Sequence, residues 1–272
     1  MTSKTLGSTG ARLLTTLAET DKNIFSIADA QEILDSSYDA ALHTLRRLTR
    51  TGWLVRLTAG RYAIVPLSSG NQANPQINRY VIVRELMEQT PYYISHESAM
   101  DIHNMLTRPV TNVIVTTPRR LTDREILNVP YRFVYAPPEA LWGSEPVWVT
   151  PYEQVTVSDL ERTILDGLAR PDLCAGVSQV ATGLWLRQDD FDWDRLAAYA
   201  HKLDVRAVAQ RLGYLLELYD LGTPSLIASL QEMVGISYAR LDALLPDDGP
   251  YLARWRLRLN LEPETLQTIV RT

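Results

Sequence analysis

Three short stretches at the start of the chain have apolar residues spaced three or four positions apart, which is typical of helices. The stretches are residues 8–20, the shorter segment 26–34, and residues 36–50. In residues 8–20 the alanine and leucine side chains fall on one face of the expected helix. The second stretch opens on Ser26 with Asp29 three residues later, a variant of the capping box that begins many helices. The pattern therefore predicts three consecutive helices.

The third of these helices has a polar face rich in arginine. Its expected apolar face comprises Tyr38, Ala41, Leu42, Leu45 and Leu48. Its polar face comprises Ser36, Ala40, His43, Arg47 and Arg50, with Asp39 and Arg46 at the margins. Ser36 is the expected N-cap of this helix, and Gly52 is its expected C-terminal stop.

Two β-rich runs follow directly, at residues 53–57 and 61–65, joined by a turn that contains glycine. This pattern predicts a short hairpin with Arg56 and Arg61 on its two strands. Three helices followed by a hairpin are typical of a winged helix-turn-helix, which we expect over residues 1–68.

The chain beyond the hairpin predicts a mixed region. Residues 69–78 are rich in Ser, Asn, Gly and Pro, which is typical of a linker. The pattern then predicts helices at 79–88 and 95–105, strands at 110–117, 131–136 and 147–157, a polar crossing at 120–127 and a turn-rich segment at 137–146.

From residue 158 the pattern is helical almost to the end. Ser158 and Glu161 stand in a capping-box relation at the first of these helices. Further helices are predicted at 176–187, 193–203, 205–219, 224–234, 237–245 and 262–270. Residues 251–261 alternate strongly and predict a half-exposed strand with Arg254, Arg256 and Arg258 on one face.

The expected fold class is α+β. The N-terminal winged helix-turn-helix is followed by a C-terminal domain over residues 79–272. That domain is expected to comprise a mixed α/β lobe with a small sheet at 79–157 and a mainly helical lobe with a late strand at 158–272.

Composition and charge narrow the classes of function. The chain has 272 residues, of which 46% are hydrophobic and 22% charged, so two or three folded units are expected. No run approaches the ~18 apolar residues that span a bilayer, and no signal peptide is evident, so we expect a cytoplasmic protein without a membrane partner. The single cysteine, Cys174, excludes an internal disulfide. The net charge is −5, yet residues 36–61 hold five arginines against one acid, so positive charge is concentrated there.

This concentration of charge indicates binding to double-stranded DNA. A helix fits the major groove, where base edges can be read, and a hairpin brings cations to the adjacent phosphates. We expect Ser36, Ala40, His43 and Arg47 to meet base edges, and Arg46, Arg50, Arg56 and Arg61 to meet phosphates. The alternatives are a solvated basic helix packed on a hairpin without a nucleic-acid role, and a protein-interaction module.

The sequence offers no strong catalytic or metal-binding pattern. His96 and His103 do not have the one-turn spacing of a zinc-binding helix. Asp159 and Glu161 suggest a nuclease, but acids in the first turn of a helix are explained by the helix dipole. We expect no enzyme, no metal and no cofactor, and keep a nucleic-acid-processing enzyme using Asp159 and Glu161 as the weaker alternative.

Four segments together resemble the AbiEi antitoxin family, the regulatory half of abortive-infection type IV toxin–antitoxin systems. They are GRYAIVP (60–66), YYISHESAMDIH (92–103), DLERTILDGLARPDLCAG (159–176) and RLGYLLEL (211–218). The resemblance implies a winged N-terminal domain that represses its own promoter. It also implies a C-terminal domain that counteracts a nucleotidyltransferase-like toxin, an action that does not require a stable complex between the two proteins. It supplies no catalytic motif and no residue-by-residue antitoxin site.

Two further expectations concern partners. Repressors usually read paired half-sites, so two copies on an inverted repeat in the operator are expected. The stripe of Arg254, Arg256 and Arg258 is the candidate C-terminal surface, which would bind RNA or a partner. A solvated strand face and pairing with acidic residues are the alternatives.

Overall fold

The computed structural model describes residues 6–65 and 77–268 and divides into two compact units. The first is Met1–Glu88 with Arg124–Pro130, and the second is Gln89–Asp123 with Tyr131–Thr272. The expected linker at 69–78 lies almost entirely outside the described residues. The structure mixes helices with small sheets, so the expectation of a protein with both α and β elements is confirmed.

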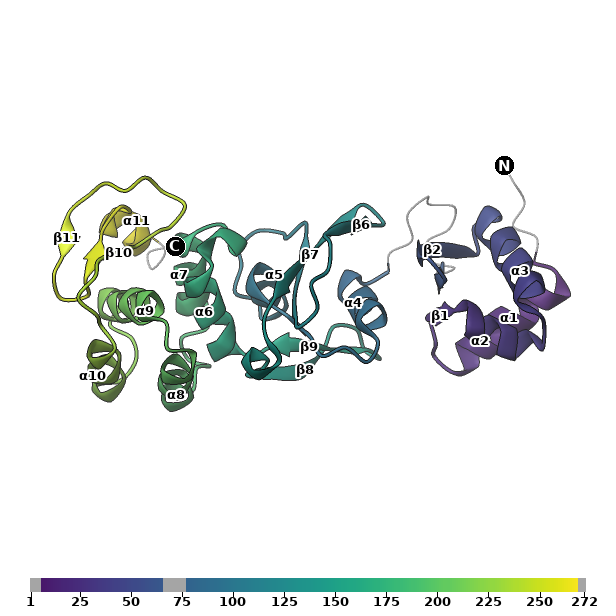
Figure 1. Ribbon diagram of the computed structural model, residues 1–272, viewed down its shortest axis with the longest axis horizontal. Helices are drawn as coiled ribbons and strands as arrows, with labels where there is room; N and C mark the ends of the chain where they lie inside the picture. Colours follow the sequence, from purple (N-terminus) through teal and green to yellow (C-terminus); the bar gives the residue numbers. More distant parts are fainter. Residues whose placement is uncertain (1–5, 66–76, 269–272) are drawn as a thin grey trace. The chain divides into compact units, whose positions relative to one another are not determined.

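The first unit begins with three helices and three strands (Figure 1). In chain order these are α1 (Ser8–Glu19), β1 (Ile24–Ser26), α2 (Ile27–Leu34), α3 (Tyr38–Arg50), β2 (Leu54–Thr58) and β3 (Arg61–Ile64). The elements α4 (Arg79–Met87) and β6 (Arg124–Ile126) also belong to this unit. Both were expected in the C-terminal domain over residues 79–272.

The helices of the first unit form as their patterns indicate. In α2 the predicted capping box is confirmed, because the Ser26 hydroxyl accepts from the Asp29 amide while the Asp29 carboxylate accepts from the Ser26 amide. Leu13, Leu45 and Leu48 are fully buried and join α1 to α3.

The hairpin is confirmed and carries a third strand that the sequence did not predict. The order is β1–β3–β2, with both pairings antiparallel. The three residues of β1 are too few to show an alternating pattern, so only tertiary pairing defines the strand. At the turn of the hairpin the Gly60 carbonyl accepts a hydrogen bond of 3.1 Å from the Ile27 amide, which ties the turn to the start of α2.

Two details of the predicted third helix were wrong. Its N-cap is Ser37, whose hydroxyl accepts from the Ala40 amide at 3.4 Å, and Ser36 precedes the cap. Tyr38, assigned to the apolar face, is 53% exposed, because the helix begins at Tyr38 and its first turn extends past the core.

The second unit contains most of a six-stranded sheet within the described residues. The order is β6–β7–β5–β4–β9–β8, with β7 (Val129–Tyr135), β5 (Val113–Thr117), β4 (Tyr93–Ile94), β9 (Gln154–Ser158) and β8 (Ser144–Trp148). β5 pairs in parallel with β7, and β4 pairs in parallel with β9. The pairs β4–β5 and β8–β9 are antiparallel.

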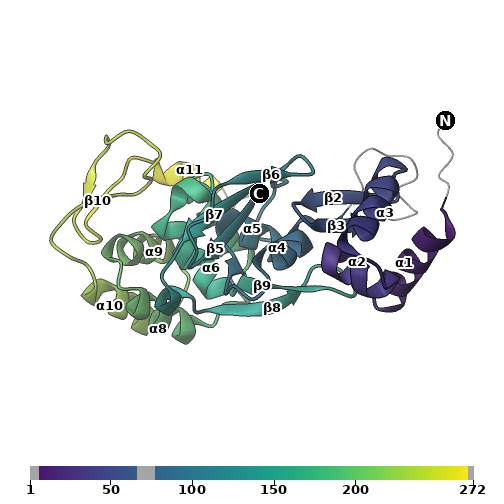
Figure 2. The ribbon, with the colours of Figure 1, turned by 45° about the vertical axis from the view of Figure 1, so that its right-hand side comes forward.

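Helices cover this sheet and extend the unit away from it. They are α5 (His96–Ile102), α6 (Leu160–Ala169), α7 (Val177–Leu186), α8 (Trp193–Leu203), α9 (Arg206–Tyr219), α10 (Pro224–Glu232) and α11 (Pro263–Gln267). Two short 3₁₀ helices lie at Pro138–Ala140 and Pro171–Leu173. In both ribbon views α6 lies between the sheet and the group of α8, α9 and α10 (Figures 1 and 2).

Several predictions beyond residue 88 were wrong. The first helix is capped by Asp159, whose side chain accepts from the Arg162 amide at 2.8 Å, because Ser158 is the last residue of β9. The polar crossing at 120–127 contains β6, and the turn-rich segment contains the start of β8. No helix forms at 237–245, where two residues instead form β10 (Ala239–Arg240).

The predicted strand at 251–261 was also wrong. It is two short strands, β11 (Tyr251–Leu252) and β12 (Leu257–Arg258), paired antiparallel around a turn. Arg256 in that turn has a φ of 48°, a left-handed backbone conformation that breaks the alternation of a strand.

Candidate nucleic-acid interface

The helix α3 is positioned by its buried face and by its two ends. Ala41, Leu45 and Leu48 are fully buried in the core of the first unit. Asp39 lies in the first turn and Arg50 in the last turn, where each charge complements the helix dipole. The opposite face of α3 is therefore free to meet a ligand.

The structure brings four of the predicted α3 residues onto that outer face. Ala40, His43, Arg46 and Arg50 are exposed. Their spacing follows the helical repeat, so they form one stripe along the helix.

The other two predicted α3 residues lie elsewhere. Arg47 is half-buried and faces the start of α1, where a Cβ built on Gly7 would lie 3.5 Å from Nη1 of Arg47. Ser36 is half-buried, and its Oγ is buried without a hydrogen-bond partner among the described residues. Neither side chain shares the outer stripe of α3.

The two hairpin arginines differ in their surroundings. Arg56 is exposed, and its Nε donates to the Thr58 carbonyl at 3.1 Å, which holds the side chain along the hairpin. Arg61 is half-buried and forms an ion pair with Glu88. The positive charge of Arg61 is therefore partly neutralised within the protein.

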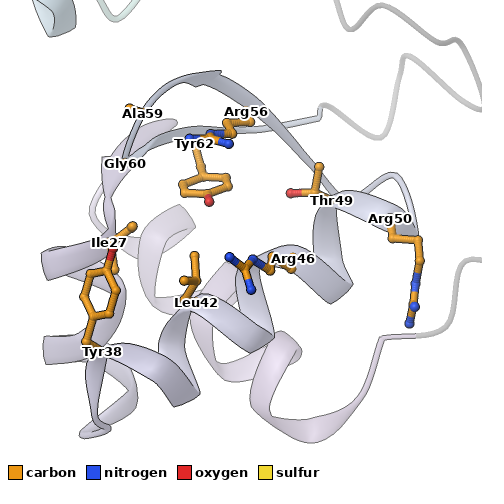
Figure 3. Close-up of a pocket in the computed structure, with 10 residues that line it drawn as sticks. All are labelled: Ile27, Tyr38, Leu42, Arg46, Thr49, Arg50, Arg56, Ala59, Gly60 and Tyr62. Atoms are coloured by element: carbon orange, nitrogen blue, oxygen red, sulfur yellow. The ribbon is translucent and has the colours of Figure 1, made fainter.

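A groove of about 680 Å³ lies between α3 and the hairpin (Figure 3). Its lining comprises Ile27, Tyr38, Leu42, Arg46, Thr49, Arg50, Arg56, Ala59, Gly60 and Tyr62. Three of these residues are arginines and none is acidic. Within residues 6–65 and 77–268, Arg46, Arg50 and Arg56 have no carboxylate partner. This groove therefore offers a ligand three arginines and no competing carboxylate in its lining.

Sequence patterns alone did not identify Tyr38 and Tyr62 as part of this groove. Both tyrosines occupy positions at which the helix and strand patterns predict apolar core residues. Their hydroxyl groups are the one signal that could have distinguished them, because a buried tyrosine usually places its hydroxyl beside a polar partner.

The candidate C-terminal surface is not a single stripe. Arg254 lies with its Nε 2.8 Å from Glu217, Arg256 lies over the Tyr238 ring at 5.3 Å, and Arg258 is 3.4 Å from Asp247. The three arginines are thus engaged separately, so their joint role as one cationic face has no geometric support.

The carboxylates considered for catalysis have structural partners. Asp159 caps α6 and also accepts from the Tyr199 hydroxyl at 3.1 Å, and its burial raises its pKa. The fully buried Glu161 side chain accepts from the Asp192 amide and forms an ion pair of 2.8 Å with Arg195. Both acids therefore fasten α6 to α8, which explains their presence without catalysis.

The histidines of the second unit are also bound within the fold. Nδ1 of His96 is 2.8 Å from the Ser95 hydroxyl, and Nε2 of His103 is 2.6 Å from the Ser158 carbonyl. In the described part of the chain, no group of three or more His, Cys, Asp or Glu side chains is arranged to hold a metal ion. Likewise, none of the helices that the structure describes is long and apolar enough to cross a membrane.

Comparison with known proteins gives a likeness of fold. No protein-family model matches the chain, and no curated protein matches it. The crystal structure of the RV2827C protein from Mycobacterium tuberculosis is similar over 98% of this chain and 96% of that chain, with a TM-score of 0.74. The two sequences are 17% identical, so the likeness concerns the fold alone.

Proposed function

We propose that the N-terminal unit is a winged helix-turn-helix that binds double-stranded DNA. The observation that carries this proposal is the groove beside α3, which three arginines line and no carboxylate does. The order of helices and strands from α1 to β3 supports it, because a helix followed by a hairpin can reach a groove and its phosphates together.

Within this proposal, α3 enters the major groove with Ala40 and His43 toward the base edges. Arg46, Arg50 and Arg56 contact phosphates. Arg47 and Ser36 are left out of the base-reading set because both are half-buried. Arg61 contributes less than expected because Glu88 already pairs with it.

For the whole chain we propose a transcriptional repressor and antitoxin. It would repress its own operon and counteract a nucleotidyltransferase-like toxin, as the AbiEi resemblance implies. Two copies would bind an inverted repeat, since repressors usually read paired half-sites. This wider role rests on the sequence resemblance, whereas DNA binding rests on the geometry of α3 and the hairpin.

DNA binding can be tested with the full chain and a labelled duplex from the region upstream of its own gene. Fluorescence anisotropy with a shuffled duplex of equal length gives the sequence preference. His43→Ala should lower that preference by roughly 1–3 kcal/mol, because a base contact is lost. Arg50→Ala should weaken both duplexes alike and reduce the slope of affinity against salt by about one.

Arg132→Ala is the matched control, since Arg132 is a half-exposed arginine of the second unit and lies outside the groove. It should leave both affinities unchanged. A wild-type chain that binds neither duplex would refute the proposal and favour a protein-interaction module. Footprinting that shows a single unpaired site would refute the inverted repeat.

A further inference from the structure

Tyr62 has a hydroxyl that none of the described residues engages. The residue lies on β3, is only 3% exposed, and stacks on Phe25 with ring centroids 6.2 Å apart. The part of the chain that the structure describes offers its hydroxyl no hydrogen-bond partner, and Figure 3 shows that hydroxyl pointing into the groove between α3 and the hairpin. A buried ring with an unpaired polar end facing a groove is suited to bind a ligand there.

Arg46 faces the same space from the opposite wall. Its guanidinium extends from α3 into the groove, on the side to which the Tyr62 hydroxyl points (Figure 3). Arg50, which also lines the groove, points away from this space in the same view. The two arginines are therefore not equivalent, although both lie on α3.

The remaining lining adds positive charge and apolar contact. Arg56 lies on the hairpin wall, with its Nε held by the Thr58 carbonyl. Ile27 and Leu42 contribute apolar surface. The charged groups here are all hydrogen-bond donors, so the complementary ligand is an anion that offers several acceptor oxygens. A phosphate group has this chemistry.

We propose that the groove between α3 and the hairpin is a phosphate-binding site, in which Arg46 and the Tyr62 hydroxyl hold one phosphate of the DNA backbone. This inference rests on the proposed function and deepens it. Arg46 and Tyr62 donate to the non-bridging oxygens of the same phosphate from opposite walls, and Arg56 adds to the positive potential. The strand bordering the major groove that α3 enters supplies the phosphate.

Tyr62→Phe tests the inference with the smallest change, because it removes only the hydroxyl and keeps the stacked ring. With the full chain and the upstream duplex, we expect affinity to fall roughly tenfold, as for a lost hydrogen bond to a charged group. The shuffled duplex should show the same loss, since a backbone contact carries no sequence information.

Tyr214→Phe is the matched control. The Tyr214 hydroxyl is also without a hydrogen-bond partner among the described residues, but it is buried in the second unit. Its removal should leave DNA affinity unchanged. Circular dichroism of both variants shows whether the fold is retained.

Arg46→Gln and the double variant show whether both groups serve one phosphate. If they do, Tyr62→Phe should cost much less in the Arg46→Gln background than in wild type, because the shared contact is already weakened. A neutral methylphosphonate can be placed at each position of the duplex in turn. At one position only, it should likewise reduce the cost of Tyr62→Phe. Additive losses at two different positions would overturn the shared site.

The outcomes separate this inference from the proposed function. If wild type binds the duplex and Tyr62→Phe binds it equally well, the phosphate site is refuted while DNA binding stands. If wild type binds no duplex, both are refuted. If inorganic phosphate or a mononucleotide binds in a Tyr62-dependent manner while DNA affinity is unaffected by Tyr62→Phe, the site serves a free phosphate ligand and the DNA-strand assignment is overturned.

Discussion

The buried polar residues of the second unit belong largely to the segments that resemble the AbiEi family. Arg211 donates to the carbonyl of Leu168 at 2.7 Å and to that of Leu241 at 3.0 Å, which joins α9 to the last turn of α6 and to the residue that follows β10. Asp166 accepts from the Tyr93 hydroxyl at 3.1 Å and pairs with Arg162 at 2.8 Å. Burying a polar or charged group is costly unless it is paired. The paired polar residues of these segments therefore connect the elements of the second unit to one another.

His96 is a buried residue of this kind with a consequence for acid stability. Burial is the largest cause that lowers its pKa from 6.5 to about 4. In the unfolded chain His96 binds a proton below pH 6.5, whereas in the folded chain it does so only near pH 4. Protonation therefore favours the unfolded state across that interval.

We predict that the free energy of unfolding falls as pH drops from 6.5 to about 4, with His96 accounting for about 3 kcal/mol of the fall. Urea unfolding at several pH values measures this. His96→Asn is the comparison, because Asn tolerates the residue's φ of 53° and does not titrate. An unchanged pH slope in His96→Asn would show that other groups cause the loss.

At the scale of elements, the long helices could be predicted from the sequence and the short strands could not. α8 and α9 follow from their 3.6-residue periodicity, and the shorter α2 follows also from its capping box; both are local signals. β1 and β10 hold three and two residues, so only their partners define them. The candidate site was predicted in part, because periodicity gives the face of a helix but not the packing that turns Arg47 toward α1.

The contact between α9 and the β11–β12 hairpin depends on Gly213, which has no side chain. Trp255 is fully buried, and its Nε1 donates to Glu217 of α9 at 2.6 Å. A Cβ built on Gly213 would lie 2.1 Å from the Trp255 ring, which leaves no room for any larger residue. The glycine of the RLGYLLEL segment therefore allows the indole to rest on the helix.

We predict that Gly213→Ala destabilises the second unit by roughly 3 kcal/mol, because the indole must leave its site. Urea unfolding followed by circular dichroism measures this. Gly235→Ala is the matched control in the same unit, since its nearest atom, 2.9 Å away, is on the flexible side chain of Arg206. Equal losses in the two variants would contradict the packing argument.

At the scale of the whole molecule, the two compact units suggest that the two proposed activities are separable. The groove belongs to the first unit, whereas the resembling segments 92–103, 159–176 and 211–218 lie in the second. A change that removes charge from the groove should therefore affect repression and leave protection from the toxin intact.

We predict that full-length Arg50→Ala/Arg56→Ala loses repression of a reporter under the upstream promoter. It should still protect cells that express the product of the adjacent gene, if that product is the toxin. Gly213→Ala should show the reverse pattern. Reporter output and growth, measured in the same strains, decide between separable and linked activities. Parallel loss of both in the double arginine variant would mean that protection requires DNA binding.

The hydrogen bond between Ile27 and Gly60 limits how the hairpin can vary. The bond joins the turn between β2 and β3 to the start of α2, so an insertion in this turn would break the bond and release the end of the hairpin. Related chains should therefore keep this turn at constant length while the surface of α3 diverges. If the first unit binds DNA as proposed, footprinting should show a short protected stretch for each copy, because this bond holds the turn of the hairpin against the start of α2.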